Sequence, residues 1–91
     1  MAKESLNNVV LVGSKPIEKY IFAVVAQFKN NKTVKVKARG RNISRAVSVV
    51  EATRNKNLVD FKIKNINIGT DVLQTESGER RVSFIEIELE R

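Results

Sequence analysis

The stretch Lys37-Ala38-Arg39-Gly40-Arg41 joins a strand pattern to a helix pattern and places three cations within five residues. Alternating valines and lysines precede it, and apolar residues at helical spacing follow it. Gly40 tolerates a positive φ and lets another backbone approach closely. Arginine presents a planar fork of donors that matches phosphate oxygens. The loop therefore suits an extended polyanion, although an ordinary turn with solvated charges has the same composition.

The residues before this loop predict a strand, a helix and a second strand. The apolar run at residues 8–12 is typical of a buried strand, and Gly13 and Pro16 mark a turn after it. Residues 17–29 have the spacing of an amphipathic helix, and residues 33–38 alternate as a strand. Because a helix connects the two strands, we expect them to be parallel. Both strand-to-helix turns then lie at the same edge of the sheet.

The residues after the loop predict a second helix and a long hairpin. The helix covers residues 42–56, with Asn42 as a candidate cap. Residues 61–72 and 80–89 are rich in β-forming residues and flank a predicted loop at 74–79. The apolar residues of each run change phase, which indicates a bulge or strong twist where the hairpin leaves the body. We expect the distal half to project as an arm from an α+β two-layer βαβαββ sandwich.

Length and composition predict one small domain over residues 1–91, with residues 1–7 frayed. The sequence has no apolar run of membrane-spanning length and no apolar signal-peptide core, so we expect an intracellular protein without a membrane partner. It has no cysteine and no histidine. This composition excludes disulfides and thiolate or imidazole metal sites, and it removes the usual general base. We expect no enzyme activity, cofactor, metal or small-molecule substrate.

The formal net charge of +7 is concentrated in the first half of the chain. Residues 1–45 contain ten Lys and Arg and two acids, whereas residues 46–91 contain seven and eight. This asymmetry predicts a basic face for nucleic acid or another anionic surface.

The cations form three groups of candidate contacts. Lys15 at the first turn and Arg39 and Arg41 at the second would form one anion-facing rim, where backbone amides of the helix starts add donors. Lys35 and Lys37 share a strand face, and either an extension of the rim or a solvated sheet face explains them. On the arm, Arg80 and Arg81 either follow a groove or protect a sheet edge from aggregation.

Other side chains favour structural roles. The aromatics of the first helix, Tyr20, Phe22 and Phe28, are expected in the core rather than in a base-stacking platform. Glu86, Glu88 and Glu90 share one strand face, where a solvated face is a better interpretation than a divalent-cation site.

Several segments, taken in order from about residue 8 to residue 89, resemble the Alba family of small basic archaeal chromatin and RNA-binding proteins. They are residues 8–16 (NVVLVGSKP), 37–41 (KARGR), 43–47 (ISRAV), 54–56 (RNK) and 82–87 (VSFIEI). The resemblance implies a fold like the C-terminal domain of a bacterial translation initiation factor. It also implies a homodimer, or a heterodimer with a paralogue, that carries two hairpin arms.

The resemblance further implies binding to double-stranded DNA, largely without sequence preference, and to RNA. Its implied contacts are Lys15, Lys37, Arg39, Gly40, Arg41, Arg45, Arg80 and Arg81, with Asn57 and Leu58 at dimer or dimer–dimer contacts. It places the protein in the cytoplasm, on the chromosome or nucleoid, where it condenses DNA.

The sequence departs from the family pattern at three places. Ser14 replaces the first of two lysines before the proline, so position 14 has no amine for the acetylation reported in some members. Asn57 replaces an aromatic residue that helps dimers associate along DNA, which predicts weaker cooperative packing. Glu76 and Glu79 at the hairpin tip should reduce the affinity of the arm for a polyanion. We therefore expect weaker binding than in typical members.

The leading hypothesis is a dimeric architectural protein that binds phosphate backbones. A subunit of an RNA-processing or ribonucleoprotein complex is the alternative, with the same rim on RNA and the second helix on a protein. An enzyme acting on nucleic acid is disfavoured by the missing histidine and cysteine.

Overall fold

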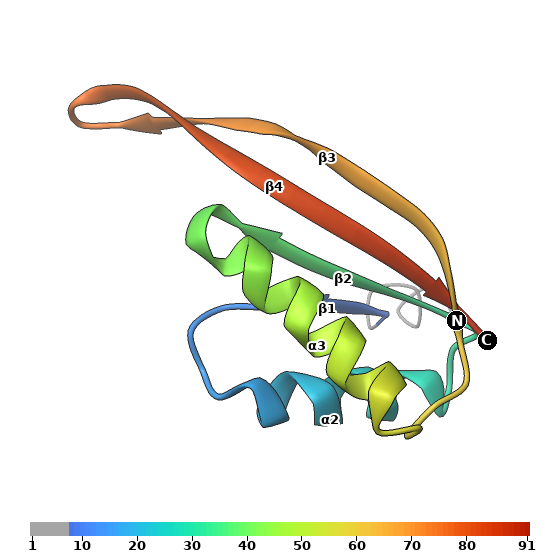
Figure 1. Ribbon diagram of the computed structural model, residues 1–91. Helices are drawn as coiled ribbons and strands as arrows, with labels where there is room; N and C mark the ends of the chain where they lie inside the picture. Colours follow the sequence, from blue (N-terminus) through green and yellow to red (C-terminus); the bar gives the residue numbers. More distant parts are fainter. Residues whose placement is uncertain (1–7) are drawn as a thin grey trace.

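A computed structural model describes residues 8–91, so the predicted fraying of residues 1–7 lies outside the described range. The elements in chain order are β1 (Val9–Leu11), α2 (Ile17–Phe28), β2 (Thr33–Arg39), the 3₁₀ turn η1 (Gly40–Asn42), α3 (Ile43–Asn55), β3 (Lys62–Thr75) and β4 (Gly78–Glu90). The two helices pack as one layer against one face of the sheet (Figure 1). The predicted α+β two-layer βαβαββ fold is confirmed. No helix within residues 8–91 is long and apolar enough to cross a membrane.

The sheet has the strand order β1-β2-β4-β3. β1 pairs with β2 in parallel, with Val10 opposite Val36, as the helical connection between them predicts. β4 is antiparallel to both of its neighbours, β2 and β3. Because β1 and β2 run in the same direction, the turns that follow them leave the sheet at the same edge (Figure 1).

The core lies between the sheet and the helix layer. Alternate residues of β2 and β4, among them Val34, Val36 and Leu89, are fully buried against the helices. Phe28 of α2 is also buried, and its ring stacks on that of Phe61 with 6.0 Å between centroids. This regular alternation explains why the β2 and β4 segments were recognisable as strands.

The aromatic residues of α2 have three different environments. Phe28 is buried as predicted, and Tyr20 is half-buried against the core. The prediction for Phe22 was wrong because its side chain is 74% exposed. Position 22 lies outside the apolar stripe of the helix, so its ring faces solvent.

The hairpin is longer and tighter than predicted. β3 and β4 continue to Thr75 and from Gly78, so two residues separate the strands instead of a loop over 74–79. Thr75 fixes this tip, since its Oγ1 donates to the carbonyl of Gly78 at 2.7 Å and accepts from the amide of Ser77 at 3.2 Å. β2 ends opposite Phe84, and the residues beyond pair only with each other. The predicted projecting arm is therefore confirmed (Figure 1).

The phase changes of the two strands have different causes. In β3 the register shifts between Ile63 and Asn65, which is the predicted bulge. It lies at the base of β3 rather than where the hairpin leaves the body, so the predicted position was wrong. β4 pairs with β3 without a bulge of its own between Val82 and Leu89. Val82 and Phe84 simply lie on the opposite face from the buried Ile85.

The ends of α3 are set by backbone conformation. The side chain of Asn42 makes no capping hydrogen bond, so its predicted capping role was wrong; Asn42 ends η1, which leads directly into the helix. At the other end, Asn57 has a φ of 54°, a conformation that asparagine tolerates better than most residues. The amides of Asn57 and Leu58 donate to the carbonyls of Arg54 and Thr53, which ends the helix in a Schellman motif.

The two faces of the sheet should respond differently to the same substitution. Leu89→Ala removes a fully buried side chain and should lower the free energy of unfolding by about 2–4 kcal/mol. Leu11→Ala removes a side chain that is 71% exposed and should change it by less than about 0.5 kcal/mol. Urea denaturation at one protein concentration measures both. Equal losses would show that the helix-covered face is not the core.

Candidate nucleic-acid interface

The first strand-to-helix turn is held by side chains from both helices. Pro16 precedes the first residue of α2 with a φ of −55°, which suits entry into a helix. The amide of Lys15 donates to the hydroxyl of Tyr20 at 3.2 Å. Arg45 of α3 donates from Nε to the carbonyl of Gly13 at 2.8 Å and from Nη2 to the carbonyl of Lys15. The backbone of Lys15 is thus anchored while its side chain is exposed.

The second turn carries its cations outward. Arg39 ends β2, and Gly40 begins η1 with a φ of 58°, the left-handed conformation that the sequence suggested. A Cβ built on Gly40 would lie 3.6 Å from Val82 Cγ1, which is an ordinary contact. The backbone conformation, and not lack of space, is therefore the reason for glycine. Arg39 and Arg41 are both exposed on either side of it.

Arg45 joins these two turns into one unit. It lies two residues after the start of α3, which follows directly from η1, and it reaches back to the turn after β1. Its guanidinium therefore contacts two backbone carbonyls, although the sequence placed Arg45 among the nucleic-acid contacts. Reasoning from sequence missed this role because 32 residues separate Arg45 from Gly13 and no local pattern links them.

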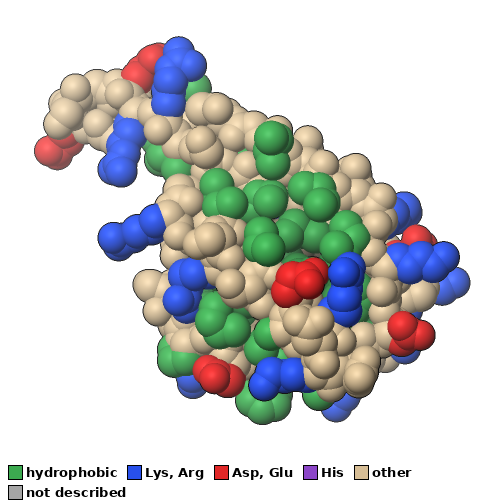
Figure 2. All heavy atoms as spheres, viewed as in Figure 1, with side chains coloured by type: hydrophobic (Ala, Val, Ile, Leu, Met, Phe, Trp, Pro, Cys, Tyr) green, Lys and Arg blue, Asp and Glu red, His purple; other side chains and the backbone are tan. Residues whose placement is uncertain are grey.

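The arm extends the row of cations along the same edge. Arg80 and Arg81 are exposed and pair across the hairpin with Leu73 and Val72. In Figure 1 the arm, η1 and the β1–α2 turn lie on the same side of the molecule. Figure 2 shows blue Lys and Arg side chains along that side, with red acidic ones near the end of the arm. We call this surface the basic edge: Lys15, Arg39, Arg41, Arg80 and Arg81.

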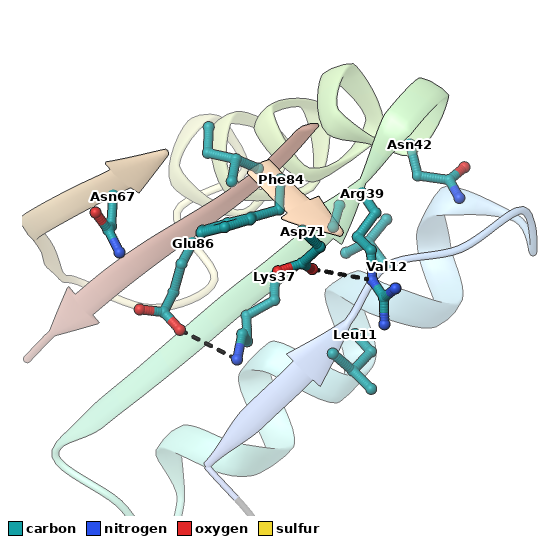
Figure 3. A pocket seen from close by; sticks show the side chains of 11 residues that line it. Leu11, Val12, Lys37, Arg39, Asn42, Asn67, Asp71, Phe84 and Glu86 are labelled. Carbon is teal, nitrogen blue, oxygen red and sulfur yellow. Dashed lines mark ion pairs between the residues drawn. The ribbon is translucent and has the colours of Figure 1, made fainter. Parts of the chain in front are cut away.

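Two carboxylates hold cations on the face of the sheet opposite the helices. Lys37 Nζ lies 3.2 Å from Glu86 Oε2, and Arg39 Nε lies 3.7 Å from Asp71 Oδ2 (Figure 3). The side chains of the Arg39 pair are 57% and 43% exposed, so water screens the attraction. A phosphate can replace such a weakly held carboxylate. The sequence did not indicate Asp71, because its position depends on the register of β3.

The acidic residues of β4 share a face, as their spacing predicted. Glu86, Glu88 and Glu90 lie opposite Lys37, Lys35 and Thr33 of β2, respectively. The three carboxylates are therefore spread along β4, each beside its own residue of β2. Within the part of the chain that the structure describes, no three carboxylates, histidines or cysteines are grouped to hold a metal ion.

The residues predicted for dimer or dimer–dimer contact lie at the far end of α3. Asn57 and Leu58 are both exposed, and Leu58 retains 49% of its accessible surface. The structure thus separates them from the turns that carry Lys15 and Arg41 by the length of the helix (Figure 1).

Comparison with known proteins identifies the family. The Alba family model matches residues 8–70, which includes both turns and most of β3. The chain belongs to the Alba family. A protein named DNA/RNA-binding protein Alba from Picrophilus torridus is 48% identical over the whole of both chains. One of the same name from Methanothrix thermoacetophila is 50% identical over 91% of this chain and 94% of its own.

Solved structures agree with this assignment. Alba from Thermoplasma volcanium superposes with a TM-score of 0.86 at 47% identity, over 92% of this chain and all of that one. ALBA1 from Trypanosoma brucei superposes with a TM-score of 0.77 at 25% identity, over 93% of this chain and 69% of that one. These likenesses confirm the expected family resemblance and the fold. The implied likeness to a translation initiation factor stays a prediction.

The double contact of Arg45 predicts that lysine cannot replace it in this Alba chain. Arg45→Lys keeps the charge but loses the planar fork that reaches two carbonyls. We expect the amide resonances of Ser14 and Lys15 to shift in Arg45→Lys as much as in Arg45→Ala. Arg54→Lys is the matched control, because Arg54 lies near the other end of the same helix. Its guanidinium pairs with Glu51 at 3.4 Å and lies 5.9 Å from the centroid of the Phe61 ring. Unchanged Ser14 and Lys15 resonances in Arg45→Lys would contradict the anchoring role.

Proposed function

We propose that this Alba-family chain binds double-stranded DNA and RNA through their phosphate backbones, largely without reading sequence. The observation that carries the proposal is the convergence of two cationic turns and an arginine-bearing arm on one edge. The relatives named DNA/RNA-binding protein Alba support the choice of nucleic acid over other polyanions. Residues 1–91 would act as one binding domain on the cytoplasmic nucleoid and contribute to archaeal chromatin organisation.

The mechanism is electrostatic. Each Lys or Arg that contacts a phosphate releases condensed counterions, so affinity falls steeply as salt rises. Contacts of this kind position a protein on a nucleic acid without specifying bases. The anchored Lys15 turn and the Arg39–Arg41 turn are held in fixed relation by Arg45, so they lose little conformational freedom when they bind. The arm adds Arg80 and Arg81 at a distance from the body, where a groove of the duplex can receive them.

We also propose that the binding unit is a dimer. Ile66 and Ile68 of β3 lie opposite the buried Ile87 and Ile85, hence on the helix side of the sheet, yet they are 54% and 73% exposed. Figure 2 shows hydrophobic side chains gathered between the β3–β4 ribbon and α3. We call this surface the apolar face. A small domain gains burial when such a face is covered by a second copy.

A dimer would present two basic edges and two arms to one nucleic acid. Two linked sites raise the apparent affinity above that of either site alone. A paralogue with a matching apolar face would form a heterodimer in the same way. Asn57 and Leu58 lie at the exposed end of α3 and are proposed to serve contacts between subunits or neighbouring dimers.

The alternative, an RNA-binding subunit of a larger complex, uses the same basic edge. It would differ by having a second protein on the apolar face in place of a second copy. In both cases the proposed role of the chain is binding.

The Arg39–Arg41 turn gives the direct test of backbone binding. We expect Arg39→Ala/Arg41→Ala to weaken binding to a duplex DNA and to a structured RNA. The slope of log affinity against log salt should become shallower by about 1–2 units for each binding face, because two phosphate contacts are lost. Fluorescence anisotropy across a salt series measures affinity and slope together.

Two charge variants serve as controls for this experiment. Asp71→Asn frees Arg39 from its carboxylate and should raise affinity at low salt. Asp60→Asn makes the same charge change in the connection between α3 and β3 and should not raise it. An unchanged slope in the double arginine variant would mean that the loop is only a turn.

The apolar face predicts the oligomeric state. Ile68→Asp places a charge on the helix-side surface of β3 and should convert a dimer into a monomer, which light scattering after size exclusion detects. Leu11→Asp is the matched control, since Leu11 is 71% exposed on the other face of the sheet. A dimer that survives Ile68→Asp, or a wild-type monomer, would contradict the proposed interface.

A further inference from the structure

The face of the sheet opposite the helices contains a pocket that shares only Arg39 with the basic edge. It has a volume of about 480 Å³. Its lining side chains come from all four strands and include Leu11, Lys37, Arg39, Asn67, Asp71 and Phe84 (Figure 3). Leu11, one of these lining residues, is 71% exposed. This pocket therefore combines an aromatic ring and an aliphatic side chain with polar groups at the surface.

The ring of Phe84 lies across a glycine of the neighbouring strand. Phe84 of β4 is directly opposite Gly69 of β3. A Cβ built on Gly69 would lie 2.7 Å from Phe84 Cζ and 2.8 Å from Cε2, closer than any side chain permits. Only glycine lets the ring occupy this position over the strand. The ring also lines the pocket, so it gives the sheet an aromatic surface that solvent reaches.

Two ion pairs flank the ring. Lys37 and Glu86 lie directly opposite each other on one side, and Arg39 reaches across β4 to Asp71 on the other. The four charges of these pairs balance, and the carboxylates disfavour a phosphate group in the pocket. They are suited instead to accept hydrogen bonds from amino or imino groups, and the amide of Asn67 can both donate and accept. The pocket therefore suits a neutral, planar ligand with polar edges.

We propose that this pocket binds an unpaired nucleobase, stacked on Phe84, of a strand whose phosphates lie on the basic edge. The inference deepens the proposed function and rests on it. Arg39 connects the two surfaces because it belongs to the basic edge and also lines the pocket. A base is planar and neutral, its exocyclic amino groups match the carboxylates, and aromatic stacking is a common means of holding single-stranded nucleic acid.

The pocket discriminates between paired and unpaired nucleic acid. A base within a duplex is stacked on both faces and has its pairing edge occupied, so it cannot lie on Phe84 without being unstacked. Loops, bulges and single strands present bases that are already free. The basic edge would hold every form of nucleic acid, whereas the pocket would add affinity only for unpaired segments.

A tryptophan at position 84 provides a direct reporter. The chain contains no tryptophan, so Phe84→Trp introduces a single indole whose emission reports on position 84 alone. We expect a single-stranded 12-nucleotide RNA to quench this emission, and a DNA of the same sequence to do so by a similar amount. A duplex DNA of equal length should bind, as anisotropy shows, while leaving the emission nearly unchanged.

The affinity test makes the same substitution at the half-buried Phe84 and at the exposed Phe22. Phe84→Leu should weaken binding of the single-stranded RNA by about fivefold or more, the loss expected for one stacked base. Its affinity for duplex DNA should stay within about twofold of wild type, which also shows that the variant is folded. Phe22→Leu, on a 74% exposed ring of α2, should leave both affinities unchanged.

The outcomes separate this inference from the proposed function. If Phe84→Leu binds single-stranded RNA as tightly as wild type, or if the Phe84→Trp emission ignores both single strands, the base site is overturned while duplex binding still supports the basic edge. If wild-type protein binds neither duplex nor single strand with a salt dependence, the proposed function fails and the base site fails with it. Selective loss of single-strand binding in Phe84→Leu, with quenching in Phe84→Trp, supports the inference.

Discussion

The parallel pairing of β1 with β2 is the constraint on which the rest of the structure depends. Two parallel neighbours must end at the same edge, so the Lys15 turn and the Arg39–Arg41 turn are brought together although the chain separates them by a helix and a strand. Arg45 then fixes their relative position through two backbone carbonyls. Cations on flexible loops would lose more conformational freedom on binding than this anchored pair does.

The sheet divides the molecule's surface into regions with separate tasks. On the helix side, alternate residues of β2 and β4 form the core, and the isoleucines of β3 continue the same face beyond the cover of the helices. On the other side, the Lys37–Glu86 and Arg39–Asp71 ion pairs flank Phe84. The alternation of side chains along β2, β3 and β4 thus supplies the core, the apolar face and the pocket. The arm is the part of these strands that extends past the end of β2.

Much of the fold was predictable because its signals are local. The apolar stripe of α2, the alternation in β2 and the glycine between Arg39 and Arg41 each specify a structure over a few residues. The errors have separate causes. The phase change in β4 is a change of face and not a bulge, and Phe22 points away from the core because its position lies off the stripe. Asn42 ends a 3₁₀ turn, which removes the need for a side-chain cap.

In the candidate site, too, the sequence predicted some features and missed others. Lys15, Arg39, Arg41 and the arm arginines were recognisable as exposed cations, and parallel pairing was enough to place the two turns together. The anchoring contacts of Arg45 and the pairing of Arg39 with Asp71 depend on registers that the sequence does not encode locally. The glutamates at the hairpin tip remain consistent with a weaker arm, because both are exposed on the arm that carries Arg80 and Arg81.

The central claim is that both turns and the arm form one phosphate-binding surface, and an NMR titration tests it most directly. Isotope-labelled protein would be titrated with a short duplex DNA at low salt while the backbone amide resonances are followed. The account predicts that resonances of the Lys15 turn, the Gly40 turn and residues 79–82 shift together with one apparent Kd, while those of the exposed face of α2 around Phe22 stay in place. Shifts confined to the arm, or centred on α2, would contradict it.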